Sequence, residues 1–318
     1  MKTSIVKGIP ISALSLGTVQ LGVNYGINND AGKPDRSVAF QILDKALEKG
    51  ITALDTAAGY GDSEEIIGEW LKTVDPAKRP FVMTKLPHSA MGHKDLDTLR
   101  KAVREGVESC KTRLGLEQIP LLMLHNMDDY NGNEENVTRV FEELKANGDI
   151  LYSGISAYSH HDYAKLAASG FDATQIPMNI FDWSQIENGG IKELEKSGMM
   201  VFVRSVYMQG LVFKSPENPG EGMDFAVPTL RKFRALCEKY NLEPATLAMS
   251  FVLSLPGVHS LVLGSEKVIQ VEQNAELFDK VVQLTPEQMA EIRENFIDTP
   301  QRVLYPAQWP NAMAGSRK

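Results

Sequence analysis

Cysteine is scarce in this sequence: its 318 residues include only Cys110 and Cys237, which lie far apart in the chain. A disulfide framework and a CxxC-type metal or redox unit are therefore excluded. The sequence also has no HExxH motif, and adjacent His160 and His161 cannot share one helix face as paired zinc ligands do. We expect no metal site, and a reducing, cytoplasmic location.

Long hydrophobic runs and excess positive charge are missing as well. Lys7, Gly8 and Pro10 interrupt the first apolar stretch before it reaches signal-peptide length, and no later run approaches the roughly 20 apolar residues of a membrane span. The formal net charge is -8, which does not favour phosphate backbones or acidic lipid. We expect neither a nucleic-acid nor a membrane partner, and the sequence gives no indication of the oligomeric state.

Short apolar and β-branched runs alternate with longer helical patterns along the chain. Most of these runs lack polar alternation, which is typical of parallel strands buried on both faces. Eight such runs cover residues 13–16, 51–54, 81–84, 121–124, 151–155, 173–176, 200–203 and 260–263. Because eight strand–helix units close a barrel, we predict a (β/α)8 TIM barrel rather than an open doubly wound sheet. No Pro-, Gly- or Ser-rich linker divides the chain, so we expect a single domain over residues 1–318.

The helical patterns have clear periods and ends. The clearest begins near Asp97 and ends at Gly115, where a left-handed cap is expected. Its apolar residues recur at spacings of three and four: Leu99, Val103, Val107, Cys110 and Leu114. Further helices are predicted over residues 37–49, 64–72, 134–146, 160–168, 190–196, 229–240, 244–253, 266–278 and 286–295. An N-terminal β-hairpin around Lys7 and Gly8 is expected to close the bottom of the barrel.

Polar residues follow most of the predicted strands, at the barrel end where the chemistry of this fold is located. They are Asp55, Lys85, His125, Ser156, Gln175, Arg204 and the pair Gly264 and Ser265. Each has a plainer interpretation when taken alone: Asp55 as a helix cap, Lys85 as a solvated rim charge, and His125 as a hydrogen-bonded structural group. Three ionisable side chains of different types at the ends of three successive strands would have to be buried or paired. Burial beside an opposite charge is how the shifted pKa values of functional residues arise.

A longer motif supports the functional interpretation of these residues. Residues 55–64, DTAAGYGDSE, follow the second strand, MTK ends at Lys85, and LMLH ends at His125. Together these segments resemble the aldo-keto reductase family, and the resemblance extends from about Leu16 to about Asn274. It implies a catalytic tetrad of Asp55, Tyr60, Lys85 and His125. It also implies reduction of an aldehyde or ketone, including sugar-like carbonyls, to the alcohol.

The chemistry of carbonyl reduction accounts for these residue types. The reaction needs a hydride donor at the carbon and a proton donor at the oxygen, and a phenol of pKa about 10 is a weak acid unless its anion is stabilised. Lys85 can stabilise that anion, Asp55 can hold Lys85 charged, and His125 can hydrogen-bond the carbonyl oxygen. Tyr60 is then the acid in reduction and the base in alcohol oxidation.

Cofactor binding by a Rossmann unit is not indicated, since no GxGxxG follows the first strand. The resemblance instead implies that Ser156 and Gln175 hold the nicotinamide carboxamide, and that the helix start after residue 264 holds the adenosine phosphate. The expected cofactor-binding residues are Gly17, Thr18, Asp55, Ser156, Gln175, Arg204, Ser205, Gly264, Ser265, Lys267, Gln270, Gln273 and Asn274.

Three positions depart from the family's usual pattern. Ala157 stands where members often have Asn, and Arg204 stands where many stack a Tyr on the nicotinamide. Arg204 could bind either an anionic substrate or the pyrophosphate. Gln270 replaces an Arg that many members use for the 2'-phosphate, while Lys267 can compensate. We therefore expect NADPH as the cofactor in preference to NADH.

Aromatic residues are expected to wall the substrate site: Tyr25, Trp183, Tyr207, Tyr305 and Trp309. Three functions are consistent with the sequence. The first is an NADP-dependent carbonyl reductase acting on a small carbonyl or alcohol substrate. The second is an NADPH-binding sensory or regulatory subunit with little turnover. The third is a barrel aldolase with Lys85 as a Schiff base, which requires an uncharged Lys85 that Asp55 disfavours.

Overall fold

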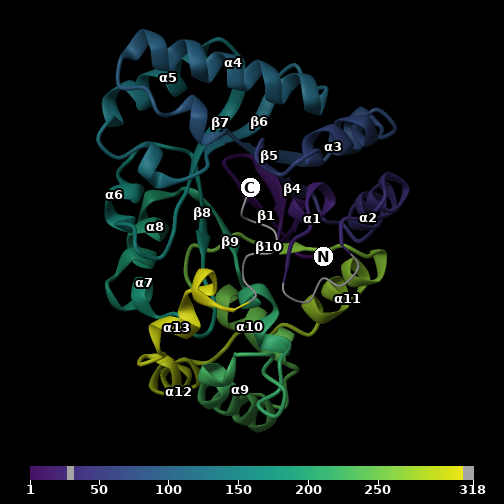
Figure 1. Cartoon of the computed structure of the whole chain (residues 1–318), viewed down its shortest axis with the longest axis vertical. Coiled ribbons are helices and arrows are strands. Elements are labelled where there is room, and N and C mark those ends of the chain that lie inside the picture. The colour runs from purple at the N-terminus through teal and green to yellow at the C-terminus, as the bar shows by residue number, and fades with distance from the viewer. Residues whose placement is uncertain (27–31, 311–318) are drawn as a thin grey trace.

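The computed structural model describes residues 1–26 and 32–310, in which eight parallel strands form a closed barrel ringed by helices (Figure 1). Around the barrel the strands follow the order β10-β3-β4-β5-β6-β7-β8-β9. Their bounds are β3 Leu14–Gly17, β4 Ala53–Asp55, β5 Phe81–Lys85, β6 Ile119–Leu124, β7 Ile150–Ser156, β8 Ala173–Pro177, β9 Met200–Arg204 and β10 Ser260–Gly264. The predicted (β/α)8 TIM barrel is confirmed.

The apolar runs of the sequence supply two separate cores. One cluster fills the barrel interior and includes Ala53, Met83, Met123, Ala173 and Phe202. A larger cluster packs the outer faces of the strands against the surrounding helices. Most residues on both faces of the strands are thus withdrawn from water, which explains why the runs lack polar alternation.

The N-terminal hairpin closes one end of the barrel, as expected. Strand β1 (Thr3–Val6) pairs antiparallel with β2 (Ile9–Ser12), and Val6 and Ile11 are buried in the barrel's interior cluster. The phenol of Tyr152 on β7 donates a hydrogen bond to the Lys7 carbonyl at 2.8 Å. This leaves the opposite end, where the strands terminate, as the open mouth.

The predicted helices are present with small shifts at their ends. In α4 (Leu96–Leu114) the expected stripe is buried, Asp95 accepts a hydrogen bond from the Thr98 amide, and Gly115 has φ +63° at the C-cap. The other α-helices are α1 Val19–Gly22, α2 Arg36–Glu48, α3 Ser63–Leu71, α5 Glu134–Ala146, α6 Tyr163–Ala167, α7 Ser184–Glu187, α8 Gly190–Ser197, α9 Val227–Tyr240, α10 Pro244–Leu253, α11 Val268–Phe278, α12 Pro286–Phe296 and α13 Gln301–Leu304. No helix in the described ranges is long and apolar enough to cross a membrane.

One helix prediction was too long. Residues 160–168 were expected to be helical throughout, but α6 begins only at Tyr163. Asp162 precedes it, and its carboxylate accepts hydrogen bonds from the amides of Ala164 and Lys165. An Asp in this role fixes a helix start, so His160 and His161 lie in the preceding loop.

Candidate active site

The strand alternation brings the predicted polar residues to one face. In a strand, side chains two residues apart point to the same face. Ala53, Met83 and Phe202 point into the barrel, so Asp55, Lys85 and Arg204 point inward as well. They meet at the open mouth around a cavity of about 770 Å³, which Tyr60 and His125 also line. Ten of the expected cofactor-binding residues line the same cavity: Gly17, Asp55, Ser156, Gln175, Arg204, Ser205, Gly264, Gln270, Gln273 and Asn274.

A buried ion pair lies at the base of this cavity. The Lys85 ammonium donates to the Asp55 carboxylate at 2.5 Å and to the Thr56 carbonyl at 3.0 Å, and both side chains are almost fully buried. Burial alone would lower the pKa of Lys85, but Asp55 and Tyr60 outweigh it and raise the pKa. The Lys85 side chain is therefore held charged, as the sequence analysis expected.

Gln175 has a role that the sequence did not indicate. Its amide nitrogen donates to Asp55 Oδ1 at 2.7 Å. This bond adds to the anchoring of the carboxylate and leaves the amide oxygen as the atom that can accept an N–H from a ligand. A carboxamide held by Gln175 would thus have to be the donor.

Tyr60 projects from the loop after β4 and sits over the ion pair. The Lys85 nitrogen is 5.1 Å from the centre of the Tyr60 ring, and the ring meets His125 edge-on at 5.9 Å between centroids. Burial raises the pKa of Tyr60 and Lys85 opposes that rise. The net shift is upward, so the phenol keeps its proton in this structure and Lys85 offsets only part of the cost of burial.

Two glycines explain how the Tyr60 loop approaches the end of helix α1 so closely. A Cβ on Gly22 would lie 1.7 Å from the Tyr60 carbonyl oxygen. Gly61 has φ +57°, and its Cβ would lie 2.4 Å from the Gly22 carbonyl oxygen. Only residues without a side chain allow the two backbones to pack in this way.

His125 is partly buried and remains neutral over the physiological range. Burial is the largest cause that lowers its pKa from 6.5 to about 3, and the charge of Lys85 adds to it. A second histidine, His88, stacks on it at 5.4 Å and makes a 2.9 Å hydrogen bond with Asp129. A neutral imidazole can donate one N–H, which suits a hydrogen bond to a carbonyl oxygen.

The depressed pKa of His125 predicts a loss of stability in acid. The unfolded chain takes up this proton as the pH falls below 6.5, whereas the folded chain resists protonation until the pH nears about 3. The contribution is present above pH 6.5 and is lost on acidification. We expect the free energy of unfolding of His125→Asn to fall between pH 7 and pH 5 by about 1–2 kcal/mol less than that of the wild type.

Urea unfolding at the two pH values measures this difference. The control is His93→Asn, because that histidine lies outside the cavity. Equal losses of stability in His125→Asn and wild type would contradict a buried neutral His125.

Three of the expected cofactor-binding residues do not line the cavity. Thr18 is fully buried, and its hydroxyl donates to the Asp55 carbonyl at 2.8 Å, so it supports the strand that carries Asp55. Ser265 is buried beside the cavity, and its hydroxyl has no partner among the described residues. Lys267 is exposed at the N-terminus of α11, where its amide and that of Glu266 donate to the Gln270 side chain at 3.0 and 2.9 Å.

The aromatic walls were predicted only in part. Tyr25 and Tyr207 line the cavity, but Trp183, Tyr305 and Trp309 do not. Trp183 is buried against Phe251, and its indole donates to the Ile180 carbonyl, so it belongs to the core. Aromatic core residues and aromatic walls have the same sequence signature, which is why this prediction failed.

Several cavity residues were missed by the sequence analysis: Gln20, Tyr158, Gln209, Phe213 and Glu266. Gln20 lies three residues after Gly17 and Glu266 directly follows Ser265, so proximity to these expected residues could have indicated them. Tyr158 lies in a loop, and Gln209 and Phe213 lie in a kinked 3-10 segment, Met208–Phe213; neither segment has a local sequence pattern, and only the fold brings them to the mouth.

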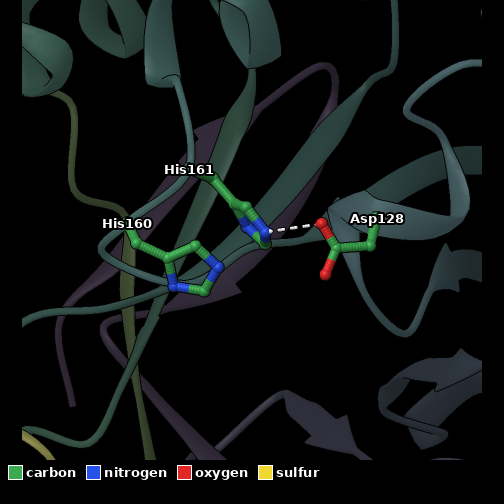
Figure 2. Close-up of side chains that lie close together, drawn as sticks. All are labelled: Asp128, His160 and His161. Atoms are coloured by element: carbon green, nitrogen blue, oxygen red, sulfur yellow. Dashed lines mark hydrogen bonds and ion pairs between the residues drawn. The ribbon is translucent and has the colours of Figure 1, made fainter.

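A cluster of possible metal ligands lies in the loops beyond β6 and β7 (Figure 2). The ligand atoms of Asp128, His160 and His161 lie within 4.8 Å of one another. Nδ1 of His161 accepts the Tyr158 amide at 2.9 Å, so the proton of the neutral ring is on Nε2, which donates to Asp128 at 3.2 Å. In this tautomer neither ring nitrogen has a lone pair free for a metal. The cluster therefore serves to fix the loop that carries Tyr158.

Comparisons with known proteins agree with this geometry. The model of the family described as "Aldo/keto reductase family" matches residues 13–296. The chain is 27% identical to the NADH-specific methylglyoxal reductase of Escherichia coli over 84% of the chain and 89% of that protein. It is 26% identical to a candidate voltage-gated potassium channel beta subunit of Schizosaccharomyces pombe, over 94% of the chain and 93% of that protein. The holo form of an aldo-keto reductase from Bacillus halodurans is similar in structure, with a TM-score of 0.72, 25% identity, and coverage of 93% of this chain and 96% of that one.

Proposed function

The chain belongs to the aldo/keto reductase family, whose model spans residues 13–296, and we propose that it reduces an aldehyde or ketone to the alcohol with Tyr60 as the proton donor. Family membership implies a nicotinamide cofactor and carbonyl reduction. The observation that carries the assignment of Tyr60 is its position with His125 in one cavity, above the buried pair of Lys85 and Asp55. We further propose that residues 1–318 act as one barrel domain on a small-molecule substrate.

The residues of the cavity fit a nicotinamide dinucleotide. The side-chain oxygens of Gln20 and Ser265 are buried without a partner among the described residues; the Gln20 side chain lies against Gly264, and Ser265 follows it in the chain. Such groups cost free energy unless a ligand satisfies them. Ser156 and Gln175 line the inner part of the cavity, and Gln273 and Asn274 line it at α11. Polar partners are thus available along its length.

The chemistry follows from the positions of the side chains. A reduced nicotinamide bound in the cavity would supply the hydride for the carbonyl carbon. Tyr60 gives its phenolic proton to the carbonyl oxygen, while the neutral His125 donates a hydrogen bond to the same oxygen. Lys85 stabilises the resulting tyrosinate, and Asp55 keeps Lys85 charged and in place. In the reverse direction the tyrosinate removes the proton of the alcohol.

The same ion pair argues against an aldolase. A Schiff base requires a neutral lysine as nucleophile, whereas Asp55 and Tyr60 raise the pKa of Lys85. The ammonium is also committed to the Asp55 carboxylate and the Thr56 carbonyl. Lys85 is therefore better suited to electrostatic stabilisation than to covalent catalysis.

We propose NADPH as the preferred cofactor, with the 2'-phosphate near the exposed Lys267. The Gln270 side chain accepts from the amides of Glu266 and Lys267 just before α11, so the Lys267 ammonium is available to attract phosphate there. The opposing group is Glu266, whose carboxylate accepts from Gln270 at 2.6 Å. The balance between the charges of Lys267 and Glu266 sets the preference for NADPH over NADH.

These charges predict opposite effects of two substitutions on cofactor choice. Lys267→Met is expected to lower kcat/KM for NADPH by about 3- to 10-fold relative to NADH, since one surface charge contact with phosphate is lost. Glu266→Gln is expected to raise the same ratio, because it removes a negative charge. Steady-state kinetics with both cofactors measures the ratio. Equal changes for NADPH and NADH in Lys267→Met would contradict this position of the phosphate.

A regulatory role is the second candidate function. The similarity to a candidate potassium channel beta subunit over 94% of the chain favours it. In this role the chain would bind NADPH without useful turnover. The presence of Tyr60, His125, Lys85 and Asp55 around one cavity favours catalysis instead.

Cofactor oxidation by the purified protein over a panel of aldehydes, ketones and aldoses separates the two functions. We expect substrate-dependent oxidation of NADPH, detected at 340 nm, with formation of the alcohol. If NADPH binds but none of the panel is reduced, the regulatory function is supported and the reductase is rejected.

A further inference from the structure

The imidazole ring of His125 is oriented by the rings and the loop packed around it. Tyr60 meets it edge-on, with 5.9 Å between ring centroids and an interplanar angle of 81°, and His88 stacks on it at 5.4 Å and 26°. Gly59 lies beside the ring, since a Cβ there would be 3.6 Å from Cε1 of His125. In the part of the chain that the structure describes, no hydrogen bond to a protein group holds either ring nitrogen. The direction of the N–H that the proposed reaction needs therefore depends on the neighbouring rings.

His88 reaches this position because of the way strand β5 ends. The Leu86 amide donates to the Met123 carbonyl at 3.0 Å, so the chain stays paired with β6 for one residue beyond β5. Pro87 follows with φ −69° and ψ 145°, an extended conformation, and a short 3-10 turn begins at His88. This turn places His88 over the end of β6, which His125 directly follows.

Asp129 fixes the ring of His88. Nδ1 of His88 lies 2.9 Å from Oδ2 of Asp129, and since a carboxylate only accepts hydrogen bonds, Nδ1 carries the proton. The carboxylate is 14% exposed, and it is carried by a turn in which the Asp129 amide donates to the Asn126 carbonyl at 3.1 Å. Because Asn126 directly follows His125, the segment that carries His125 also supplies the anchor for the ring stacked on it.

The exposure of His88 separates it from the substrate site. Its side chain is 59% exposed, and it is not among the described residues that line the cavity, whereas His125 is. A surface pair such as His88 with Asp129 contributes little to stability. Its charge nevertheless acts on His125: burial is the largest cause of the low pKa of His125, and the charges of Lys85 and His88 add to it. His88 therefore bears on the reaction through His125 and not through a contact with the substrate.

We propose that His88, held by Asp129, is a positioning residue for His125. It keeps the imidazole in the orientation from which its N–H reaches the oxygen of the carbonyl that is reduced. A hydrogen bond to that oxygen strengthens as negative charge develops there, so loss of the orientation lowers the rate of hydride transfer more than it weakens binding. This inference rests on the proposed reductase function.

Substitutions at both positions test this role. In single turnovers of 4-nitrobenzaldehyde with NADPH, we expect His88→Ala to lower the rate of hydride transfer about tenfold, because a donor displaced from its productive position loses much of its effect. His88→Phe keeps a flat ring for the stack and should recover most of that loss. Asp129→Ala should lie between the wild type and His88→Ala, and Asp129→Asn, whose amide oxygen can still accept from Nδ1, should lie nearer the wild type. The Kd of NADPH and the KM of the aldehyde should stay within about twofold of the wild-type values.

A double-mutant cycle shows whether His88 acts through His125. His88→Ala should slow hydride transfer far less in the His125→Asn background than in the wild type, because the ring that it orients is already absent. The matched control is His93→Ala, which removes a histidine outside the cavity and should leave the rate within about twofold of the wild type.

The outcomes separate this inference from the proposed function. If the wild type reduces the aldehyde and His88→Ala is equally fast, or slows hydride transfer by the same factor with and without His125, the positioning role is wrong and the reductase stands. A loss that His88→Phe does not recover would also overturn the inference, since the stacked ring would then not be what orients His125. A rise in KM that differs between aldehydes, with an unchanged rate of hydride transfer, would make His88 a substrate contact instead. Absence of turnover in the wild type with any aldehyde would reject the reductase function and this inference with it.

Discussion

Tyr60→Phe is expected to lower kcat for carbonyl reduction by about 10²- to 10⁴-fold, the usual contribution of a positioned general acid. The substitution removes one hydroxyl and leaves the aromatic ring, which packs edge-on against His125 and lies over the Lys85 ammonium. Because the ring remains, the cavity should keep its shape. Steady-state reduction of 4-nitrobenzaldehyde with NADPH measures the loss.

Binding of the cofactor provides the control for this prediction. The Kd of NADPH for Tyr60→Phe should stay within about twofold of the wild-type value, since ground-state binding does not use the phenolic proton. A matched control substitution is Tyr207→Phe, whose hydroxyl in the same cavity contacts Asn274 at 3.2 Å, and it should retain most of the turnover. Normal turnover in Tyr60→Phe would show that another group donates the proton.

Loss of the carboxylate of Asp55 has the second large expected effect, on stability as well as turnover. In Asp55→Ala the Lys85 ammonium is left buried without its partner, and the Gln175 amide loses its acceptor. Removing one member of a buried ion pair typically costs about 3–5 kcal/mol. We expect the free energy of unfolding in urea to fall by about that amount.

A second substitution in the same pair distinguishes an unpaired charge from a simple cavity. The double variant Asp55→Ala with Lys85→Met has no buried charge at this position, so it should be more stable than Asp55→Ala alone and still inactive. On the surface, Lys280→Met breaks a pair with Glu243 in which both side chains are about 60% exposed, and it should cost less than about 1 kcal/mol. A double variant no more stable than Asp55→Ala would contradict the account of Lys85 as a charge held by Asp55.

The sequence predicts the barrel and the four residues at its centre for a physical reason. Strands buried on both faces give apolar runs that stand out between helices, and the residue that ends each run must meet its counterparts at one mouth. Asp55, Lys85 and His125 are found from this rule. Tyr60 requires the motif that surrounds it, because it lies five residues beyond its strand.

Other features depend on contacts between distant segments and could not be predicted. The bond from Gln175 to Asp55 joins residues 120 positions apart. Trp183 was expected at the cavity, but it packs in the core, since an aromatic residue suits both places. The tautomer of His161 is set by the Tyr158 amide and by Asp128, which the sequence does not place together. In each case local pattern identifies the residue type, and tertiary packing decides its partner.

Transfer of a deuterium label from the cofactor to the product is the most direct test of the claim that this chain reduces carbonyls by hydride transfer. The wild-type enzyme would be supplied with 4-nitrobenzaldehyde and NADPH that carries deuterium at C4 of the nicotinamide on one face, and separately with the opposite-face isomer. Direct hydride transfer predicts deuterium on the alcohol carbon of the product from one isomer and none from the other, as read by mass spectrometry. Loss of the label to water, or no alcohol at all while NADPH remains bound, would contradict the account of this chain as a carbonyl reductase.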